Sequence, residues 1–397
     1  MREGWKNVPL SELASFYSGG TPSKGRATYW GGPIPWVTVK DMKGIRLKSV
    51  GETLSKEGAD TVRIVPAGTV LVLVRGMGLF KDLPVVLCDR PVTFNQDIKA
   101  LVAKKGIDSE YLACVLIARK SDILRHVDSA GHGTGRLDTD LLKSTPLQLP
   151  PLPEQRKIAE ILRTWDEAIE KLEALRVAKE QRRKGFLQVL FGVDRPFPSH
   201  WKVKPLEQIV ERIRRTNDGG EHPVMTISAK SGFMMQSDKF ARDMAGSSVD
   251  RYTLLYEGEF AYNKGNSKTA PYGCIFPLDR PSAVIPFVYF CFKLKGRLHQ
   301  PFYTHLFAAG VLHHQLSRLI NSGVRNDGLL NLYADDFFSC RVPVPPLTEQ
   351  QEIATAITAV NDEITLLNKE IEVLTRQKRG LMQKLLTGEW RVKGSKN

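Results

Sequence analysis

The sequence predicts an α+β protein in which two globular α/β domains are separated by two long helices. The helices are expected to form an intramolecular antiparallel coiled coil within a pseudo-twofold repeat. Three observations predict this fold: a repeat with an offset of 195 residues, an apolar heptad pattern in two segments, and short apolar runs between glycine and proline turns. The 397 residues suffice for two or three folded units, and a hydrophobic content of 42% supplies their cores.

The repeat sets the order of the chain. Residues 151–155, Pro-Leu-Pro-Glu-Gln, return as residues 346–350, Pro-Leu-Thr-Glu-Gln, and the two copies stay in phase for the next 35 residues. Upstream, Trp5-Lys6 recurs as Trp201-Lys202. We therefore predict globular domains at residues 1–152 and 196–345. A helix follows each, at 153–195 and at 346–397, the latter with a C-terminal tail.

Apolar residues recur at intervals of three and four through both helical segments. The expected contact positions are 158, 162, 165, 169, 172, 176, 179, 183, 186 and 190, and the residues 195 further along. Seven of the ten are apolar in the first segment and nine of the ten in the second. A stripe held for five heptads is typical of a coiled coil. Pro153 near one start, and Gly192 and Gly388 after the last apolar residues, agree with helix ends there.

Two such stripes are most simply buried against each other, because a lone helix would expose its stripe to water. The globular domain between them returns the chain to its starting end. We therefore expect antiparallel helices, with the domains at opposite ends of this spacer. Arg176, Lys179 and Arg183 interrupt the first stripe. They are interpreted either as solvated side chains or as contacts to a partner subunit or a phosphate.

The globular domains are expected to mix strands and helices. Apolar runs predict strands at 70–74, 85–87 and 223–227, and helices at 109–125 and 310–320. Four tryptophans are expected to pack in the cores: Trp5, Trp30, Trp36 and Trp201. Of the net charge of +14, residues 1–152 carry +6 and residues 196–345 carry +5. This distribution favours a polyanionic partner such as nucleic acid.

Composition also excludes some classes of protein. The longest apolar stretch, 283–292, contains Pro286 and is too short to span a bilayer. Residues 1–7 lack the apolar core of a secretory signal, so we expect a cytoplasmic protein. The five cysteines lie far apart and never as Cys-x-x-Cys, which indicates reduced and mostly buried thiols.

Several motifs resemble those of a known family. They are Pro-Pro-Leu-x-Glu-Gln at 150–155 and 345–350, Ser-Gly-Gly-Thr-Pro-Ser at 18–23, Tyr-Trp-Gly at 29–31, Ile-Pro-Trp-Val at 34–37 and Lys-Asp at 40–41. Over nearly the whole chain they resemble the specificity subunit of type I restriction-modification enzymes. The second domain departs from this pattern, since Arg-Arg-Thr-Asn-Asp-Gly-Gly stands at 214–220 where the first has Gly-Gly-Thr-Pro.

The resemblance implies a function and a set of partners. It implies two target-recognition domains that read an asymmetric, bipartite site in double-stranded DNA. It also implies modification (adenine methyltransferase) subunits, two of them, and restriction or translocase subunits. The chain itself is expected to be non-catalytic and to bind no cofactor, with S-adenosylmethionine, ATP and magnesium held by the partner subunits.

Sequence motifs for catalysis are incomplete. Residues 20–25 resemble a phosphate-binding loop, but the Lys and Ser or Thr that should follow are missing. No Asn-Pro-Pro-Tyr, Asp-Pro-Pro-Tyr or His-Glu-x-x-His occurs in the sequence. His313 and His314 are adjacent, so they point to different sides of a helix and make poor joint metal ligands. Asp335 and Asp336 could be nuclease carboxylates, but we interpret them as a loop ahead of a strand.

Side-chain chemistry indicates candidate DNA-binding residues. Lys and Arg neutralise phosphates, and polar side chains bond to base edges. In the first domain the candidates are Thr21, Ser23, Lys24, Arg26, Lys40, Arg75, His132, Thr134 and Arg136. In the second domain they are Arg214, Arg215, Thr216, Lys230, Lys264, Asn266, Lys268, Arg325 and Asn326.

Two other functions are open at this point. The alternative is a coiled-coil adaptor whose globular domains bind proteins or RNA, which a salt titration with duplex and single-stranded probes distinguishes from a DNA reader. The third reading, a methyltransferase or nuclease, predicts activity of the chain alone with S-adenosylmethionine or magnesium.

Overall fold

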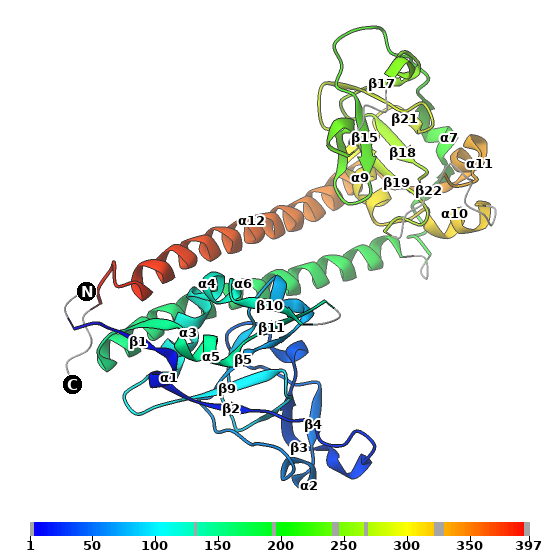
Figure 1. Cartoon of the computed structure of the whole chain (residues 1–397). Coiled ribbons are helices and arrows are strands. Elements are labelled where there is room, and N and C mark those ends of the chain that lie inside the picture. The colour runs from blue at the N-terminus through cyan, green and yellow to red at the C-terminus, as the bar shows by residue number, and fades with distance from the viewer. Residues whose placement is uncertain are drawn as a thin grey trace. The chain divides into compact units, whose positions relative to one another are not determined.

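The structure is a computed structural model that describes residues 4–130, 133–192, 196–239, 246–265, 269–320 and 329–392 (Figure 1). The chain divides into two compact units, Met1–Glu173 with Lys369–Asn397, and Ala174–Asn368. Each unit contains one globular module and half of each of two long helices. We call the globular parts module 1 (residues 4–151) and module 2 (residues 196–346).

The two long helices are α6 (Leu152–Phe191) and α12 (Leu347–Leu386), each of 40 residues (Figure 1). Both begin within the Pro-Pro-Leu-x-Glu-Gln motif, as the sequence predicts. Glycines follow both helices, and Gly388 adopts a left-handed φ of +66°, which suits a residue without a side chain.

Within each unit the two helices run antiparallel, because rising numbers on α6 meet falling numbers on α12. In the first unit Lys378 donates to Asp166. In the second unit the bonded pairs are Arg176 with Asn368, Lys179 with Glu363, and Arg183 with Asn361. All ten expected contact positions of α12 are buried or half-buried, and eight of those of α6 are. The predicted antiparallel coiled coil is confirmed.

The same pairs explain the polar interruptions of the seam. Arg176 and Arg183 donate to asparagine oxygens 3.3 and 2.9 Å away, and the Lys179 Nζ lies 2.5 Å from a carboxylate oxygen of Glu363. Lys378, the one polar residue among the ten positions of α12, is paired in the same way. All four side chains are therefore bonded to the opposite helix rather than simply solvated. Polar pairs in an apolar seam favour particular alignments of two helices, at some cost in stability.

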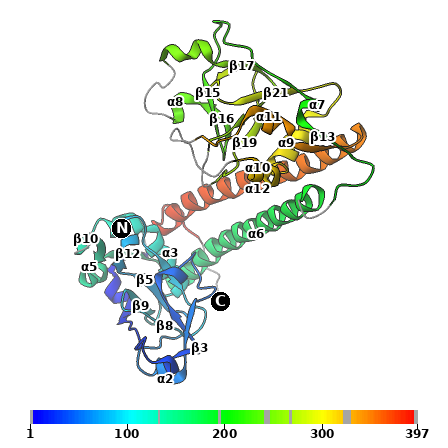
Figure 2. The same cartoon turned by 90° about the vertical axis from the view of Figure 1, so that its right-hand side faces the viewer.

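The two modules share one structural plan. A four-stranded antiparallel sheet has the order β2-β9-β5-β7 in module 1 and β14-β21-β18-β19 in module 2. The first and last strands of each module pair separately, as β1-β12 and β13-β22. Figure 2 labels β5 and β9 of the first sheet and β19 and β21 of the second. The strands of module 1 are β1 (Lys6–Pro9), β2 (Ala14–Ser18), β5 (Val70–Leu73), β7 (Val85–Leu87), β9 (Ile98–Ala103) and β12 (Pro146–Leu149). Those of module 2 are β13 (Lys202–Pro205), β14 (Val210–Arg212), β18 (Phe260–Asn263), β19 (Cys274–Pro277), β21 (Phe290–Leu294) and β22 (Arg341–Val344).

A glycine turn precedes the corresponding central strands, β5 and β18. Gly68 has φ of +80° and Gly258 has φ of +79°, a region that L side chains rarely adopt. The chain thus uses the same turn to enter the sheet in both modules.

The remaining elements differ between the modules. Module 1 adds β3 (Trp30–Val37), β4 (Glu52–Leu54) and β8 (Thr93–Phe94), and a sheet of β6 (Arg75–Gly76), β10 (Val127–Ala130) and β11 (Thr134–Leu137). Module 2 adds the pairs β15 (Met225–Ser228) with β16 (Gly232–Met235), and β17 (Thr253–Tyr256) with β20 (Ser282–Ile285). In the described part of module 2, no sheet corresponds to β10-β11-β6.

The helices of the modules also depart in part from prediction. The segment expected as one helix at 109–125 is two, α3 (Ser109–Ala118) and α4 (Lys120–Leu124), and the segment at 310–320 forms α10 (His313–Leu319) after α9 (Gln300–Ala308). Asp335 and Asp336 lie in the first turn of α11 (Ala334–Ser339), not in a loop as expected. Acidic residues favour that position because the helix N-terminus carries partial positive charge.

The Glu-Gln pair that opens each long helix joins it to its module, and we call it the Glu-Gln clamp. In module 1 the buried Glu154 accepts hydrogen bonds from Trp5 Nε1 (3.1 Å) and Arg391 Nε (2.8 Å). Gln155 accepts from the backbone N–H of Asp108 (2.9 Å), the residue that caps α3, and donates to the carbonyl of Pro150.

The second clamp repeats these bonds with one change. Glu349 accepts from Trp201 Nε1 (2.8 Å), and His200 Nε2 (2.9 Å) takes the place that Arg391 has in module 1. The Trp201 bond, followed by the His200 contact, lowers the pKa of Glu349. Gln350 accepts from the backbone N–H of His299 (2.9 Å), just before α9. The Pro-Pro-Leu-x-Glu-Gln motif therefore fastens each long helix to its module.

Each module core also contains residues from both long helices. The core of module 1 includes Ile158 and Leu162 from the start of α6, and Leu385 and Leu386 from the end of α12. The core of module 2 reverses the roles, with Phe191 from the end of α6, and Ala354 and Ile357 from the start of α12. Both helices are therefore needed to close each core.

The buried residues agree with the remaining expectations. All five cysteines are free, and four of them are buried. Trp5, Trp36 and Trp201 are buried, and Trp30 packs against Trp36 with ring centroids 5.1 Å apart. Within the described ranges, no helix is both long and apolar enough to cross a membrane.

We predict that Glu154→Ala destabilises the first unit by roughly 1–3 kcal/mol, because the buried indole N–H of Trp5 and the guanidinium of Arg391 lose their acceptor. Urea unfolding measures the change. The control is Glu173→Ala, an exposed position on the same helix. Equal stability of the two variants would contradict the role given to the clamp.

Candidate nucleic-acid interface

Strand pairing brings together candidates that lie 61 residues apart in sequence. Arg75 on β6 stands directly opposite Arg136 on β11, so both side chains project from the same face of the sheet. Both are exposed, and neither forms an ion pair with a described residue. Like charges directly opposite on a sheet are unfavourable, so this pair suits a surface that binds an anion. Thr134 begins β11, and His132 lies outside the described residues.

Two glycines allow these strands to approach. Gly76 has φ of +150°, and a Cβ on Gly135 would lie 3.1 Å from the carbonyl oxygen of Gly76 and 3.0 Å from Cβ of Leu79. Larger residues at either position would strain or separate the strands. The backbone therefore fixes where the two arginines stand.

The Gly-Gly-Thr-Pro loop is held against the edge of β8. A Cβ on Gly19 would lie 2.3 Å from the carbonyl oxygens of Phe94 and Asn95, so only glycine fits. Gly20 donates to the Phe94 carbonyl (2.9 Å), and its own carbonyl accepts from Trp36 Nε1 (3.0 Å). The glycines of this motif thus place the loop, and they are structural.

Candidate side chains in this loop are already bonded within module 1. Lys24 forms an ion pair with Glu52 (2.6 Å), and its Nζ lies 3.8 Å from the Trp30 ring centroid. Arg26 donates to the hydroxyl of Tyr29. Thr21 donates to Gln96 (2.6 Å), and the Ser23 carbonyl accepts from Trp30 Nε1 (3.1 Å). To contact phosphate, Lys24 would have to give up these contacts. By contrast, Lys40 is exposed in the short helix Val39–Asp41, and no described residue forms an ion pair with it.

The candidates of module 2 divide in the same way. Arg215 Nη2 lies 2.5 Å from Glu259 Oε1, and its guanidinium lies 4.5 Å from the centroid of the Tyr256 ring. Thr216 forms a backbone bridge with Thr253. Arg214 and Lys230 are exposed, and the structure gives neither an ion pair with a described residue.

Lys264 lies at the end of β18. Its carbonyl accepts from the backbone N–H of Leu330 (2.8 Å), and its Nζ lies 5.0 Å from the centroid of the Phe290 ring. Four candidates of module 2 fall outside the described residues: Asn266, Lys268, Arg325 and Asn326.

The structure thus sorts the predicted cations. Lys24, Arg26 and Arg215 are held by carboxylates or aromatic side chains of their own module. Five exposed cations have no such ion pair in the described part of the chain: Lys40, Arg75, Arg136, Arg214 and Lys230. These five are the better candidates for phosphate contacts.

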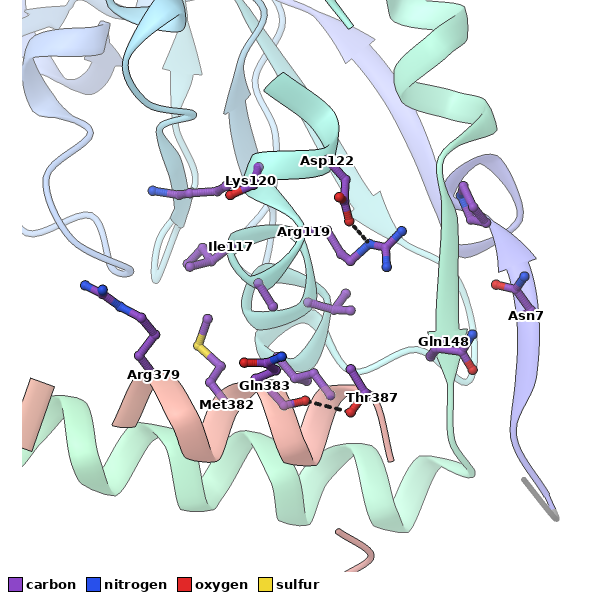
Figure 3. A pocket seen from close by; sticks show the side chains of 15 residues that line it. Asn7, Ile117, Arg119, Lys120, Asp122, Gln148, Arg379, Met382, Gln383 and Thr387 are labelled. Carbon is purple, nitrogen blue, oxygen red and sulfur yellow. Dashed lines mark hydrogen bonds and ion pairs between the residues drawn. The ribbon is translucent and has the colours of Figure 1, made fainter. Parts of the chain in front are cut away.

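Sequence reasoning missed a second repeated feature, a groove beside the end of each long helix. In the first unit a groove of about 780 Å³ lies between the end of α12 and the α3–α4 corner (Figure 3). In the second unit a groove of about 840 Å³ lies between the end of α6 and the end of α9. The helix residues that line them correspond at the repeat offset of 195: Lys184 with Arg379, Leu187 with Met382, Gln188 with Gln383, Phe191 with Leu386, and Gly192 with Thr387.

The two grooves therefore share one chemistry: a cation, two apolar side chains and a glutamine along one helix face. Lys184 and Arg379 are exposed, and neither forms an ion pair with any residue in the described ranges. The repeat register could have revealed this correspondence, but exposure along a helix cannot be read from the heptad pattern alone.

The residues weighed for catalysis show no assembled centre. Asp335 forms an ion pair with Arg212 (2.7 Å). Burial lowers the pKa of His313, whose ring centroid lies 5.4 Å from that of Tyr272. Among the described residues, no group of three His, Cys, Asp or Glu side chains is arranged to hold a metal.

Comparisons with known proteins agree with this architecture. A protein-family model described as "Type I restriction modification DNA specificity domain" matches residues 2–179 and again 198–376. The chain is 23% identical, over 98% of its length and 94% of the relative, to the type I restriction enzyme MjaIX specificity subunit of Methanocaldococcus jannaschii. It is 34% identical to the EcoR124I/EcoR124II specificity subunit of Escherichia coli, over 41% of this chain and 40% of that protein.

Solved structures share the fold. The crystal structure of a type I restriction-modification S subunit from M. genitalium matches with a TM-score of 0.60 at 17% identity, covering 96% of each chain. A structure from work on assembly and conformational transition of the type I R-M system matches with a TM-score of 0.58 at 15% identity, covering 98% of this chain and 99% of that one.

We predict that Gly19→Ala destabilises module 1 by about 1–3 kcal/mol, since its methyl group would overlap two backbone carbonyls. Gly25→Ala is the matched control, because its nearest neighbour would be 3.8 Å away. Thermal unfolding of both variants measures the difference. A Gly19→Ala protein as stable as Gly25→Ala would show that the loop is not held against β8.

Proposed function

This chain belongs to the family of type I restriction-modification DNA specificity domains, and from that membership we propose that its two modules read the two halves of one bipartite DNA site. Its role is sequence-specific DNA recognition, as a specificity subunit that is not itself catalytic. In this proposal module 1 reads one half-site, module 2 reads the other, and the paired helices are the spacer between them.

The facing arginines Arg75 and Arg136 carry the proposal for module 1. Phosphate contacts position a protein on the duplex, and arginine is also the commonest side chain to read guanine. The sheet that presents this pair has no counterpart in the described part of module 2, which instead exposes Arg214 and Lys230. Two different surfaces fit two different half-sites, and hence an asymmetric site.

The repeated groove supports the recruitment of two identical partners. In both grooves an exposed cation and apolar side chains lie along one face of a long helix. Such a groove suits an amphipathic helix of a partner protein that carries a carboxylate. We assign one modification subunit to each groove, with restriction subunits joining the assembly. S-adenosylmethionine, ATP and magnesium are then bound by these partners, and the complex works in the cytoplasm.

The family match disfavours the adaptor for proteins or RNA, because the matched model covers both modules and names DNA specificity. Duplex and single-stranded probes distinguish the two functions. Tighter binding of single-stranded RNA than of duplex DNA by the assembled complex would favour the adaptor.

Exchanging module 1 for that of another specificity subunit is predicted to change one half of the target and leave the other half unchanged. Mapping methylated adenines in cells that express the hybrid with its modification subunit measures this. The reciprocal exchange of module 2 is the control. A hybrid that changes both halves would refute the division of labour.

Charge reversal in the grooves is predicted to remove modification subunits one at a time. Lys184→Glu and Arg379→Glu should each leave a complex with one modification subunit, and the double variant none, as counted by native mass spectrometry. Arg182→Glu and Lys369→Glu make the same charge change on the same helices at exposed positions that do not line the grooves. Two subunits retained in both single groove variants would contradict the assignment.

A further inference from the structure

Two large apolar side chains stand exposed beside the arginine pair. Met77 is 75% exposed and Phe80 is 52% exposed, the highest values among the large apolar residues described in the first unit. They lie three residues apart in the short helix Met77–Phe80 that follows β6. Single exposed apolar residues are ordinary, but two neighbours on a charged surface indicate a binding role.

The turn that carries them is firmly held. Between the two exposed residues, Leu79 is fully buried in the module 1 core. The backbone N–H groups of Lys81 and Asp82 both donate to the Gly78 carbonyl at 3.0 Å, and the Asp82 carboxylate pairs with Lys120 (2.8 Å). The exposed side chains therefore project from a turn that is anchored to the module 1 core.

The surroundings favour one kind of ligand. Arg75 comes two residues before Met77, and Lys81 directly follows Phe80. Arg136 faces Arg75 across the strands. Duplex DNA satisfies the cations and the apolar side chains together, because its phosphates flank stacked bases, and three neighbouring cations suit this polyanion better than a single carboxylate.

We propose that Met77 and Phe80 form an apolar wedge that enters between base pairs of the half-site read by module 1. This inference rests on the proposed function. Unstacking a step costs a few kcal/mol, so the wedge favours steps that kink easily, pyrimidine followed by purine. Module 1 then selects its half-site partly by how easily the DNA there is deformed, while Arg75 and Arg136 bind the phosphates.

The test uses the chain assembled with its modification subunits and a duplex that carries the mapped target. 2-Aminopurine replaces an adenine of the half-site read by module 1 other than the one that is methylated, because methyltransferases flip their own target base and the fluorescence rises whenever a base is unstacked. The variants are Met77→Ala and Phe80→Ala. Leu141→Ala, a 43% exposed apolar residue elsewhere in module 1, is the matched control, and Arg75→Ala tests the phosphate contacts.

Each wedge variant should bind the duplex about tenfold more weakly and lose the fluorescence rise, with Phe80→Ala the more affected because an aromatic ring stacks on bases. The slope of log K against log salt should stay unchanged, since no phosphate contact is lost. Arg75→Ala should instead reduce that slope by about 0.9. Leu141→Ala should match the wild-type protein in DNA affinity, in the fluorescence rise and in the salt slope.

Three results separate the possible failures. Wedge variants that match Leu141→Ala in affinity and fluorescence overturn the wedge but leave the proposed function standing. Variants that keep their DNA affinity but lose modification subunits overturn the wedge, and indicate that Met77 and Phe80 contact a partner protein. Failure of the wild-type complex to bind the duplex overturns the proposed function itself. A further experiment exchanges thymine for uracil in the half-site read by module 1. A loss of affinity equal to that of the variants would indicate contact with the thymine methyl groups rather than unstacking, and would overturn the wedge.

Discussion

The hydrogen bonds of the Glu-Gln clamp support the rest of the structure. In each module a glutamate accepts a hydrogen bond from the indole N–H of the first tryptophan, Glu154 from Trp5 and Glu349 from Trp201. The neighbouring glutamine accepts from the backbone N–H just ahead of a module helix. A buried carboxylate is stable only when its acceptor sites are filled, so the clamp fixes the module on the helix as well as the helix on the module. Together with the core residues that both long helices contribute, the clamp fixes the direction of the surface that each module presents relative to the helix that carries it.

The long helices could be predicted from sequence because their signal is local and periodic. Three- and four-residue spacing identifies the buried face whatever the partner, and the repeat supplies the partner. The pairing of Arg176, Lys179 and Arg183 could not be predicted, because it depends on which residue of the other helix lies opposite. Asp335 and Asp336 were misplaced for a related reason. A short helix of six residues has too little periodicity to distinguish it from a loop.

The types of residue in the candidate interface could be predicted from the sequence, but their arrangement in space could not. Side-chain chemistry selected Arg75 and Arg136, but their position opposite each other depends on the pairing of two strands, which brings together residues 61 apart in sequence. The same chemistry selected Lys24 and Arg215, whose charges the structure shows to be matched by Glu52 and Glu259. A loop cation is available to DNA only when its own domain has not already neutralised it, and a linear sequence does not reveal that state.

The contribution of α12 to the core of module 1 bears on how the protein is made. Leu385 and Leu386 share one core with Ile158 and Leu162, yet the ribosome adds them more than 220 residues later. Until α12 has been made, module 1 therefore keeps an open apolar surface. Its maturation waits for a helix that is synthesised after module 2, so synthesis rate and chaperone access have more influence on its folding than they have on a domain that closes before the next one emerges.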